Sequence, residues 1–258
     1  MKQQFRACSL LFTMLAVLTL AGTGSFGQTD PVIDARIGLN ALVALTDSHF
    51  ERLIDVMEVL AATSELQSGD WETIRPILAA LKHVHIPGVY CWVKPDGSYY
   101  TVAKGKQIKN LADRGYFPTV MKGQPVVGDL LFSTSTGKKV SVNTVPIEQD
   151  GEIVSALIVS VFLETFSKYL IDQLKIPDDV YFFAIDDGGR IALHSDVELI
   201  LKSRDFFQVS NVVQQAMKNM LQEKEGTATV EYHGVSRSVV FTTSPLTGWH
   251  FAIGVKNR

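Results

Sequence analysis

The pattern of apolar and polar positions first predicts a long helix near the start of the chain. Over residues 32–62 the apolar positions recur at helical spacing, with Leu42, Leu45, His49, Phe50, Leu53, Ile54, Met57 and Leu60 among them. Residues three and four apart lie on one face of an α-helix, so this segment predicts an amphipathic helix about 45 Å long. Ser68, Gly69 and Asp70 then break the pattern, and Asp70 suits the N-cap of a second helix over residues 71–83.

Short apolar runs separated by turn residues come next and predict strands. These runs cover residues 88–93, 98–102, 125–133, 139–146 and 152–162. Pro95-Asp96-Gly97, Thr136-Gly137 and Asp150-Gly151 supply turns between them, because Gly and Asp tolerate the positive φ of tight hairpins. We therefore expect an antiparallel sheet of about five strands, followed by a helix over residues 163–174.

The strand pattern then returns in a shorter form. Strands are predicted over residues 180–185, 190–194, 226–232, 237–244 and 249–255, with a helix over 206–223. The fold class is therefore α+β, a long N-terminal helix followed by two antiparallel-sheet modules. We divide the chain into residues 1–27, N-terminal helices over 30–83, a first module over 84–175 and a smaller second module over 176–257.

The first 27 residues have the layout of a secretory signal peptide. Lys2 and Arg6 precede an uncharged apolar run over residues 7–21, and small or polar residues follow it. This predicts a periplasmic, extracytoplasmic protein. The alternative is an uncleaved anchor in the inner membrane, since no Ala-x-Ala site precedes Gln28.

Composition narrows the classes of function. The chain has 258 residues, of which 46% are hydrophobic, and this is enough for a sizeable core. Its net charge of -3 shows no excess of basic residues, which a nucleic-acid-binding protein would need. Of the two cysteines, Cys8 would leave with the signal peptide. Cys91 is then alone in an apolar strand, so we expect a buried thiol and no intramolecular disulfide.

One segment groups residues that suit binding of a small anion. In NLADRGYFPTVMKG, Arg114 stands beside Tyr116 and Phe117. A guanidinium is a planar fork of donors that matches a carboxylate, and two rings can wall a small apolar slot. The structural alternatives are that Arg114 pairs with Asp113 or another acid and fixes the loop, and that Tyr116 and Phe117 fill the core.

Catalytic and metal-site motifs are missing from the sequence. The six histidines are scattered without cysteine or carboxylate partners at ligand spacing, and Asp186-Asp187-Gly188-Gly189 lacks the further acids of a calcium loop. No nucleophile elbow, phosphate loop or zinc-protease motif occurs. We expect a protein that is not an enzyme and that has neither cofactor nor metal.

Five segments in order resemble the double Cache sensor domain, a tandem of PAS-like modules. They are WVKPDGSYY, NLADRGYF, the stretch from STSTGKKV to VFLETF, FFAIDDGGRIALHS and TGWHFAIGV. The resemblance covers about residues 30–255. It implies an extracytoplasmic ligand-sensing fold, in which the first, membrane-distal module holds the ligand and the second, membrane-proximal module carries the signal onward.

The resemblance also implies which residues surround the ligand. Besides Arg114, Tyr116 and Phe117, the hydroxyl positions it places around the pocket include Thr134, Thr144 and Ser160. Trp92 and Tyr99 are further candidates from strand alternation, because one of each neighbouring aromatic pair in the first hairpin faces the covered side of the sheet, against ligand or core. Members that bind amino acids carry an aspartate near the position of Ser160, where it neutralises the ligand's ammonium. A hydroxyl cannot do so in a desolvated pocket. We therefore expect a small carboxylate or another small metabolite rather than a free α-amino acid.

The chain ends three residues after its last predicted strand, without a transmitter. We therefore expect a separate membrane signalling partner, and the long helix suggests a homodimer. The alternative function is a scaffold or interaction protein that kept the fold and lost the ligand.

Overall fold

A computed structural model of the chain describes residues 31–81, 87–202, 211–232 and 234–257. The predicted signal peptide, the end of the predicted second helix at His83 and the start of the predicted helix over 206–223 lie outside these residues. Among the helices of these described residues, none has the continuous apolar length that a membrane span requires.

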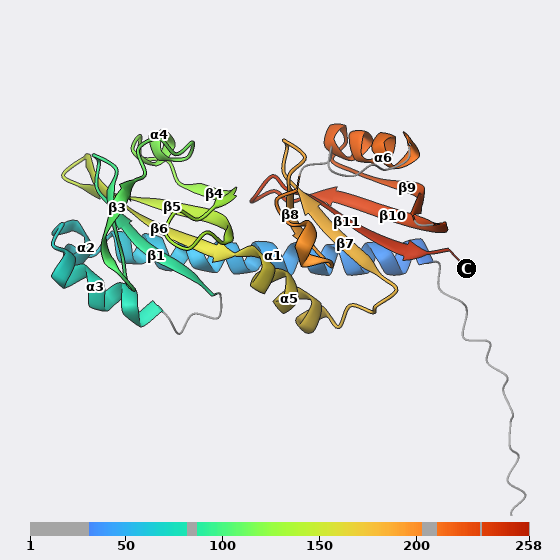
Figure 1. Ribbon diagram of the computed structural model, residues 1–258, viewed down its shortest axis with the longest axis horizontal. Helices are drawn as coiled ribbons and strands as arrows, with labels where there is room; N and C mark the ends of the chain where they lie inside the picture. Colours follow the sequence, from blue (N-terminus) through green and yellow to red (C-terminus); the bar gives the residue numbers. More distant parts are fainter. Residues whose placement is uncertain (1–30, 82–86, 203–210, 233, 258) are drawn as a thin grey trace, which may run out of the picture.

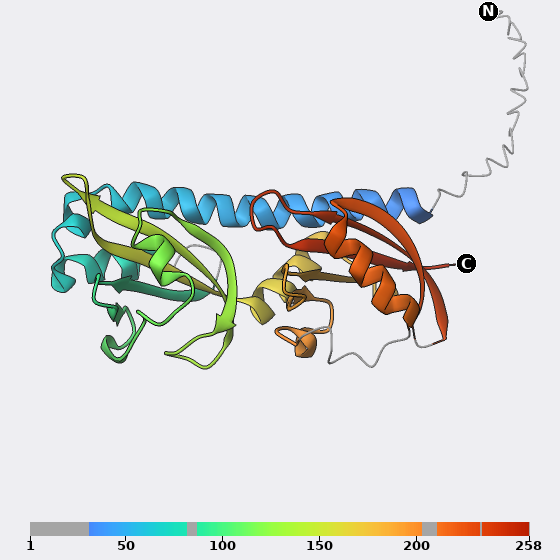
Figure 2. The same ribbon diagram turned by 90° about the horizontal axis from the view of Figure 1, so that it is seen from above.

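The molecule is an elongated α+β structure in which one helix runs behind two sheets (Figures 1 and 2). Helix α1 spans Pro31–Ala61, 31 residues, and is therefore about 46 Å long. Most of its buried residues form one stripe, Ala35, Leu39, Leu42, Thr46, Phe50, Leu53, Met57 and Ala61, and Asp47 and His49 are buried beside it. This confirms the predicted helix, and the stripe packs on both modules because it extends over the whole helix.

Two short helices connect α1 to the first sheet. Helix α2 spans Ser64–Gln67 and α3 spans Trp71–Ala80. As predicted, Asp70 is the N-cap of α3, where its carboxylate accepts hydrogen bonds from the amides of Glu72 and Thr73. This satisfies donors that the first turn of a helix would otherwise leave unpaired.

The first sheet is antiparallel and has the strand order β3-β2-β1-β6-β5-β4. Its strands are β1 (Gly88–Val93), β2 (Ser98–Thr101), β3 (Gly105–Asn110), β4 (Val126–Phe132), β5 (Lys139–Gln149) and β6 (Glu152–Phe162), with α4 (Phe117–Val120) between β3 and β4. We call this sheet with α4 the first module. One face packs on α1 and α3, and α4 lies over the other (Figure 1).

The second sheet is also antiparallel and has the order β8-β7-β11-β10-β9. It follows α5 (Leu163–Leu174) and contains β7 (Tyr181–Ile185), β8 (Ile191–His194), β9 (Glu225–Tyr232), β10 (Val235–Thr243) and β11 (His250–Lys256), with the 3-10 helix η2 (Val197–Leu199) and α6 (Asn211–Gln222). We call this the second module. The fold class predicted from the sequence is confirmed.

Two details of the first sheet differ from the sequence prediction. Strand β3 was not predicted, since its residues are mostly exposed and polar and give no alternating pattern. Strand β5 continues past Pro146 to Gln149. A proline is tolerated there because β4 pairs with β5 only as far as Thr144, so beyond it β5 has a free edge.

Candidate functional site

The loop that carries Arg114 is fixed to the turn between β1 and β2. The Leu111 amide donates to the Gly97 carbonyl at 2.9 Å, and the Asn110 side chain donates to the Asp96 carbonyl at 2.8 Å. Gly97 has a φ of +79°, and a Cβ there would collide with Asn110. The Phe117 amide then donates to the Arg114 carbonyl at 2.9 Å and starts α4. Hydrogen bonds therefore hold the loop in a defined conformation on the first module.

Behind this loop lies a compact apolar layer that we call the outer cluster, on the sheet face turned away from α1. It consists of Cys91, Val93, Tyr99, Leu111, Tyr116, Phe117, Val120, Val140, Val142, Ala156 and Ile158. Tyr116 and Phe117 are both buried in it, Tyr116 being only 5% exposed. The two rings next to Arg114 thus pack against strands β1, β2, β5 and β6.

Seven of the eight predicted site residues belong to this side of the sheet. Tyr99 lies in the outer cluster, and its hydroxyl is 3.1 Å from the Thr134 hydroxyl. Ser160 lies opposite Val142 in the β5–β6 register, so strand alternation places it on the same face. Thr144 follows Val142 by two residues. It is fully buried, and its hydroxyl accepts a hydrogen bond of 3.1 Å from the Val126 amide.

Trp92 is the exception among the predicted site residues. Its ring lies on the opposite face of the sheet, in the core shared with α1 and α3, and is 1% exposed. There it packs 5.4 Å from the Tyr100 ring, which in turn lies 5.1 Å from Trp71. The sheet separates Trp92 from Arg114, so Trp92 is part of the core and not of this group.

The Arg114 side chain is half-buried and forms no hydrogen bond or ion pair with any residue that the structure describes. Its positive charge acts on two phenols, Tyr99 and Tyr116. Burial raises the pKa of both, and the nearby guanidinium opposes that rise. The structural alternative, a pair between Arg114 and Asp113 or another acid, is not seen among the described residues.

A cavity of about 480 Å³ lies between the two modules, and of the eight predicted site residues it is Tyr116 that lines it. The first module lines it with Tyr116, Thr119 and residues 126–129 of β4, and the second module with residues 186–188, Arg190 and 247–249. Cavities of this volume are typical of small-molecule sites, which often lie between domains.

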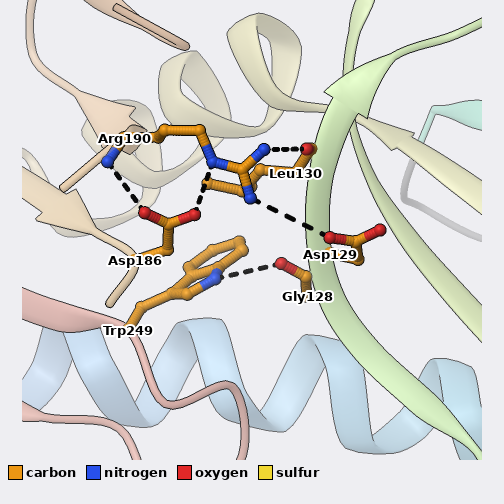
Figure 3. A network of polar contacts seen from close by, with 6 residues as sticks. All are labelled: Gly128, Asp129, Leu130, Asp186, Arg190 and Trp249. Carbon is orange, nitrogen blue, oxygen red and sulfur yellow. Dashed lines mark hydrogen bonds and ion pairs between the residues drawn. The ribbon is translucent and has the colours of Figure 1, made fainter. Parts of the chain in front are cut away.

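Polar contacts join the two modules at the wall of this cavity (Figure 3). The Trp249 indole nitrogen donates to the Gly128 carbonyl at 3.1 Å, and the Arg190 guanidinium donates to the Leu130 carbonyl at 2.7 Å. Arg190 also donates through Nε to Asp186 at 2.7 Å, and its other terminal nitrogen lies 4.0 Å from the Asp129 carboxylate.

Asp129 is a residue of this region that the sequence did not reveal. It pairs with Val142 of the outer cluster, so its side chain lies on the same sheet face as Tyr116. Burial raises the pKa of its carboxyl group, and the charges of Arg190 and Arg114 oppose that rise. A charged residue within the apolar run VVGDLLF was the available signal.

Within the described part of the chain, no three histidine, cysteine or acidic side chains come together as a metal site would require. Cys91 is buried in the outer cluster, and desolvation raises the pKa of its thiol to about 12. A thiol of such pKa is protonated at neutral pH and is a poor nucleophile.

A sequence model of the Cache domain matches residues 34–258. The chain belongs to the Cache domain family. Cache domains are sensory ligand-binding modules, and the family's solved relatives share this fold at low sequence identity. None of the curated proteins matches this Cache chain in sequence.

Solved structures resemble this Cache protein over nearly its whole described length. The extracellular domain assigned to the histidine kinase rpHK1S-Z16 has a TM-score of 0.71 at 13% identity, covering 88% of this chain and 94% of that one. The ligand-binding domain of the Pseudomonas aeruginosa PAO1 amino acid chemoreceptor PctC, in complex with GABA, has a TM-score of 0.61 at 20% identity, covering 85% and 96%. That of the Pseudomonas fluorescens chemoreceptor CtaA, with L-serine, has a TM-score of 0.64 at 16% identity, covering 87% and 95%.

Proposed function

We propose that this Cache protein is an extracytoplasmic sensor that binds a small carboxylate on the outer side of its first module. Arg114 is the anion anchor, Tyr116 and Phe117 form the apolar wall, and Tyr99, Thr134 and Ser160 supply hydroxyl groups. The cavity beside Tyr116 gives a ligand room and access. Residues 84–175 are the ligand-binding module in this proposal, and residues 176–257 receive the signal.

The observation that carries the proposal is the free guanidinium of Arg114 beside two buried tyrosines. Arg190, in contrast, is bound to a carboxylate and a carbonyl. Arg114 has no such partner among the described residues. A charged fork held next to apolar rings suits a ligand that brings a carboxylate with it.

The ligands of the similar structures support the proposal that the ligand of this protein carries a carboxylate group. PctC was solved with GABA and CtaA with L-serine, and both molecules carry a carboxylate group and an ammonium group. Their identity to this chain is too low to transfer the ligand itself. The shared carboxylate supports the proposal, and the shared ammonium bears on the second candidate below.

Asp129 favours a second candidate, a ligand with an ammonium group as well as a carboxylate. The sequence argued against an ammonium because Ser160 replaces the aspartate expected there. Asp129 places a carboxylate on the same sheet face, from β4 instead of β6. This group is able to neutralise an ammonium that Ser160 cannot.

The proposal also includes a receiver of the signal and an oligomeric form. We propose a separate membrane signalling protein as the receiver, and a homodimer through α1 as the form that it recognises. The length of α1, 31 residues, motivates the dimer, and Ile37 and Val59 are exposed on it at 64% and 70%. A monomer in sedimentation at high concentration would count against the dimer.

A thermal-shift screen with matched compounds tests the function. The series pairs butyrate with 4-aminobutyrate, lactate with alanine, and each acid with its amide. Near-saturating ligand should raise the melting temperature by several degrees. The acids should bind and the amides should not, and a gain from the amino group would select the second candidate.

Two variants assign the site in the same screen. Arg114→Ala should abolish the shift, whereas Arg75→Ala, which removes an exposed arginine of α3, should leave it unchanged. A carboxylate hit that survives Arg114→Ala would show that the anchor is elsewhere. A screen of many metabolites without any hit would favour the scaffold alternative.

A further inference from the structure

The second module holds the edge strand of the first module by its backbone. Strand β4 is the last strand of its sheet, so it has one side without a neighbouring strand. On this strand the Gly128 carbonyl accepts from Trp249 and the Leu130 carbonyl accepts from Arg190. Both donors come from the second module, and they bind residues i and i+2 of β4 (Figure 3).

Arg190 is held in place before it reaches β4. The Asp186 carboxylate accepts from the Arg190 backbone amide at 2.8 Å and from its Nε at 2.7 Å. These two bonds orient the guanidinium, so that one terminal nitrogen reaches the Leu130 carbonyl and the other lies 4.0 Å from Asp129. A guanidinium fixed at two points loses little further side-chain entropy when it makes the third contact.

Asp129 lies between the two carbonyls that the second module binds. Side chains alternate along a strand, so Asp129 points away from the face of its buried neighbour Leu130 and toward the outer cluster. The charged groups that act on it are Arg190 and Asp186 from the second module and Arg114 from the loop before α4. The candidate ligand site and the second module therefore share this one carboxylate.

We propose that Arg190 is a positioning residue of the ligand site, which fixes the place and the charge of Asp129 from across the module boundary. The inference rests on the proposed function, because Asp129 matters to a ligand only if the ligand binds beside Arg114. It makes occupancy of the site and docking of the second module linked equilibria, each of which changes the other by the same factor. A carboxylate bound at Arg114 offsets the Arg114 charge and adds negative charge near Asp129, so Asp129 then depends more on Arg190 for its counter-charge.

The test uses Arg190→Gln in the full mature chain without ligand. The pKa of Asp129 is measured by carbon-13 NMR titration, and its carboxyl signal is assigned by the loss of that signal in Asp129→Asn. In Arg190→Gln this pKa should be higher than in the wild type by about half a pH unit or more. Hydrogen exchange of the amides in residues 126–132 should become about fivefold faster, because one bond that holds β4 is lost. Arg190→Lys keeps the positive charge and should bring the pKa of Asp129 back toward its wild-type value.

Arg237→Gln is the matched control. Arg237 is also an arginine of the second module that donates to a carbonyl, that of Asp179 at 2.8 Å, but it has no contact with β4. It should change neither readout. An unchanged pKa of Asp129 in Arg190→Gln, or unchanged exchange in residues 126–132, overturns the inference. If Arg190→Gln does not fold, Arg190→Lys replaces it in the exchange measurement. Lysine lacks the forked guanidinium, so exchange in residues 126–132 should still be faster than in the wild type. Unchanged exchange in Arg190→Lys would then overturn the inference.

The proposed function fails separately from this inference. It fails if the screen of carboxylates gives no hit, whatever Arg190→Gln does to Asp129, because both readouts are taken without ligand.

Discussion

The Ser244 hydroxyl donates a hydrogen bond of 2.7 Å to the carboxylate of Asp47, a residue 197 positions earlier in the chain. The same hydroxyl accepts from the amides of Leu246 and Thr247, so it also shapes the turn that leads to Trp249. Asp47 belongs to α1. The bond therefore ties the long helix to the turn that presents Trp249 to the first module.

Two substitutions of Asp47 should separate the effect of its buried charge on folding stability from the effect of its hydrogen bond to Ser244. Burial raises the pKa of Asp47 above 3.8, against the opposing effect of the Ser244 bond. A raised pKa favours the folded state at low pH, and this contribution is lost as pH rises through the folded-state pKa. Asp47→Asn keeps an acceptor for Ser244 without the charge, so its stability relative to wild type should increase between pH 4 and pH 7.

Urea unfolding of both variants at the two pH values checks this prediction. Asp47→Ala leaves the buried Ser244 hydroxyl without its acceptor and should lower the free energy of unfolding by about 1–2 kcal/mol. A parallel pH dependence of Asp47→Asn and wild type would contradict the assigned role of the charge.

Gly128→Ala should destabilise the protein more than Gly137→Ala does. Both glycines have positive φ, +84° and +72°, so each substitution should cost about 1 kcal/mol in backbone strain. A Cβ at Gly128 would also lie 3.2 Å from the Trp249 indole nitrogen and from the Thr247 side chain, whereas one at Gly137 meets nothing within 4 Å. Overpacking adds about 1–3 kcal/mol. Equal losses in chemical denaturation would mean that the modules are not packed tightly at Gly128.

Most of the fold was predictable because local sequence patterns determine its helices, strands and turns. The stripe along α1, the Asp70 cap and the Asp150-Gly151 turn are each set by neighbours in sequence, and both turn residues do take positive φ. Strand β3 was not predictable in this way. Its Ile108 is fully exposed, so the strand exists through its pairing with β2 and not through an apolar face.

The candidate site was only partly predictable, because a strand pattern does not say which face meets the ligand. Tyr99 and Tyr100 are neighbours, yet the first lies in the outer cluster and the second packs on Trp92 in the α1 core. Alternation alone makes Trp92 a candidate for ligand or core, and it lies in the core, across the sheet from Arg114. Asp129 and Arg190 are 61 positions apart in the numbering, and only the packing of the two modules brings them together.

Arg114→Ala should leave the stability of the ligand-free protein within about 0.5 kcal/mol of wild type, because the side chain has no bond to lose among the described residues. Arg190→Ala is the comparison. It removes the donor to the Leu130 carbonyl and the partner of Asp186, and should lower the free energy of unfolding by more than about 1 kcal/mol. A loss of 2 kcal/mol or more for Arg114→Ala would assign that residue to the structure of the loop.

Cys91 should report on the opening of the outer cluster. The thiol is buried behind Tyr99 and Tyr116, and its pKa of about 12 leaves almost no thiolate at pH 8. In a chain with Cys8→Ser, a disulfide reagent such as DTNB should therefore react with Cys91 only when the outer cluster opens. Reaction should be complete within seconds in strong denaturant and slower by orders of magnitude in its absence. Stoichiometric reaction of the native protein within seconds would show that the face behind Arg114 is open to solvent, and the apolar wall assigned to Tyr116 and Phe117 would have to be abandoned.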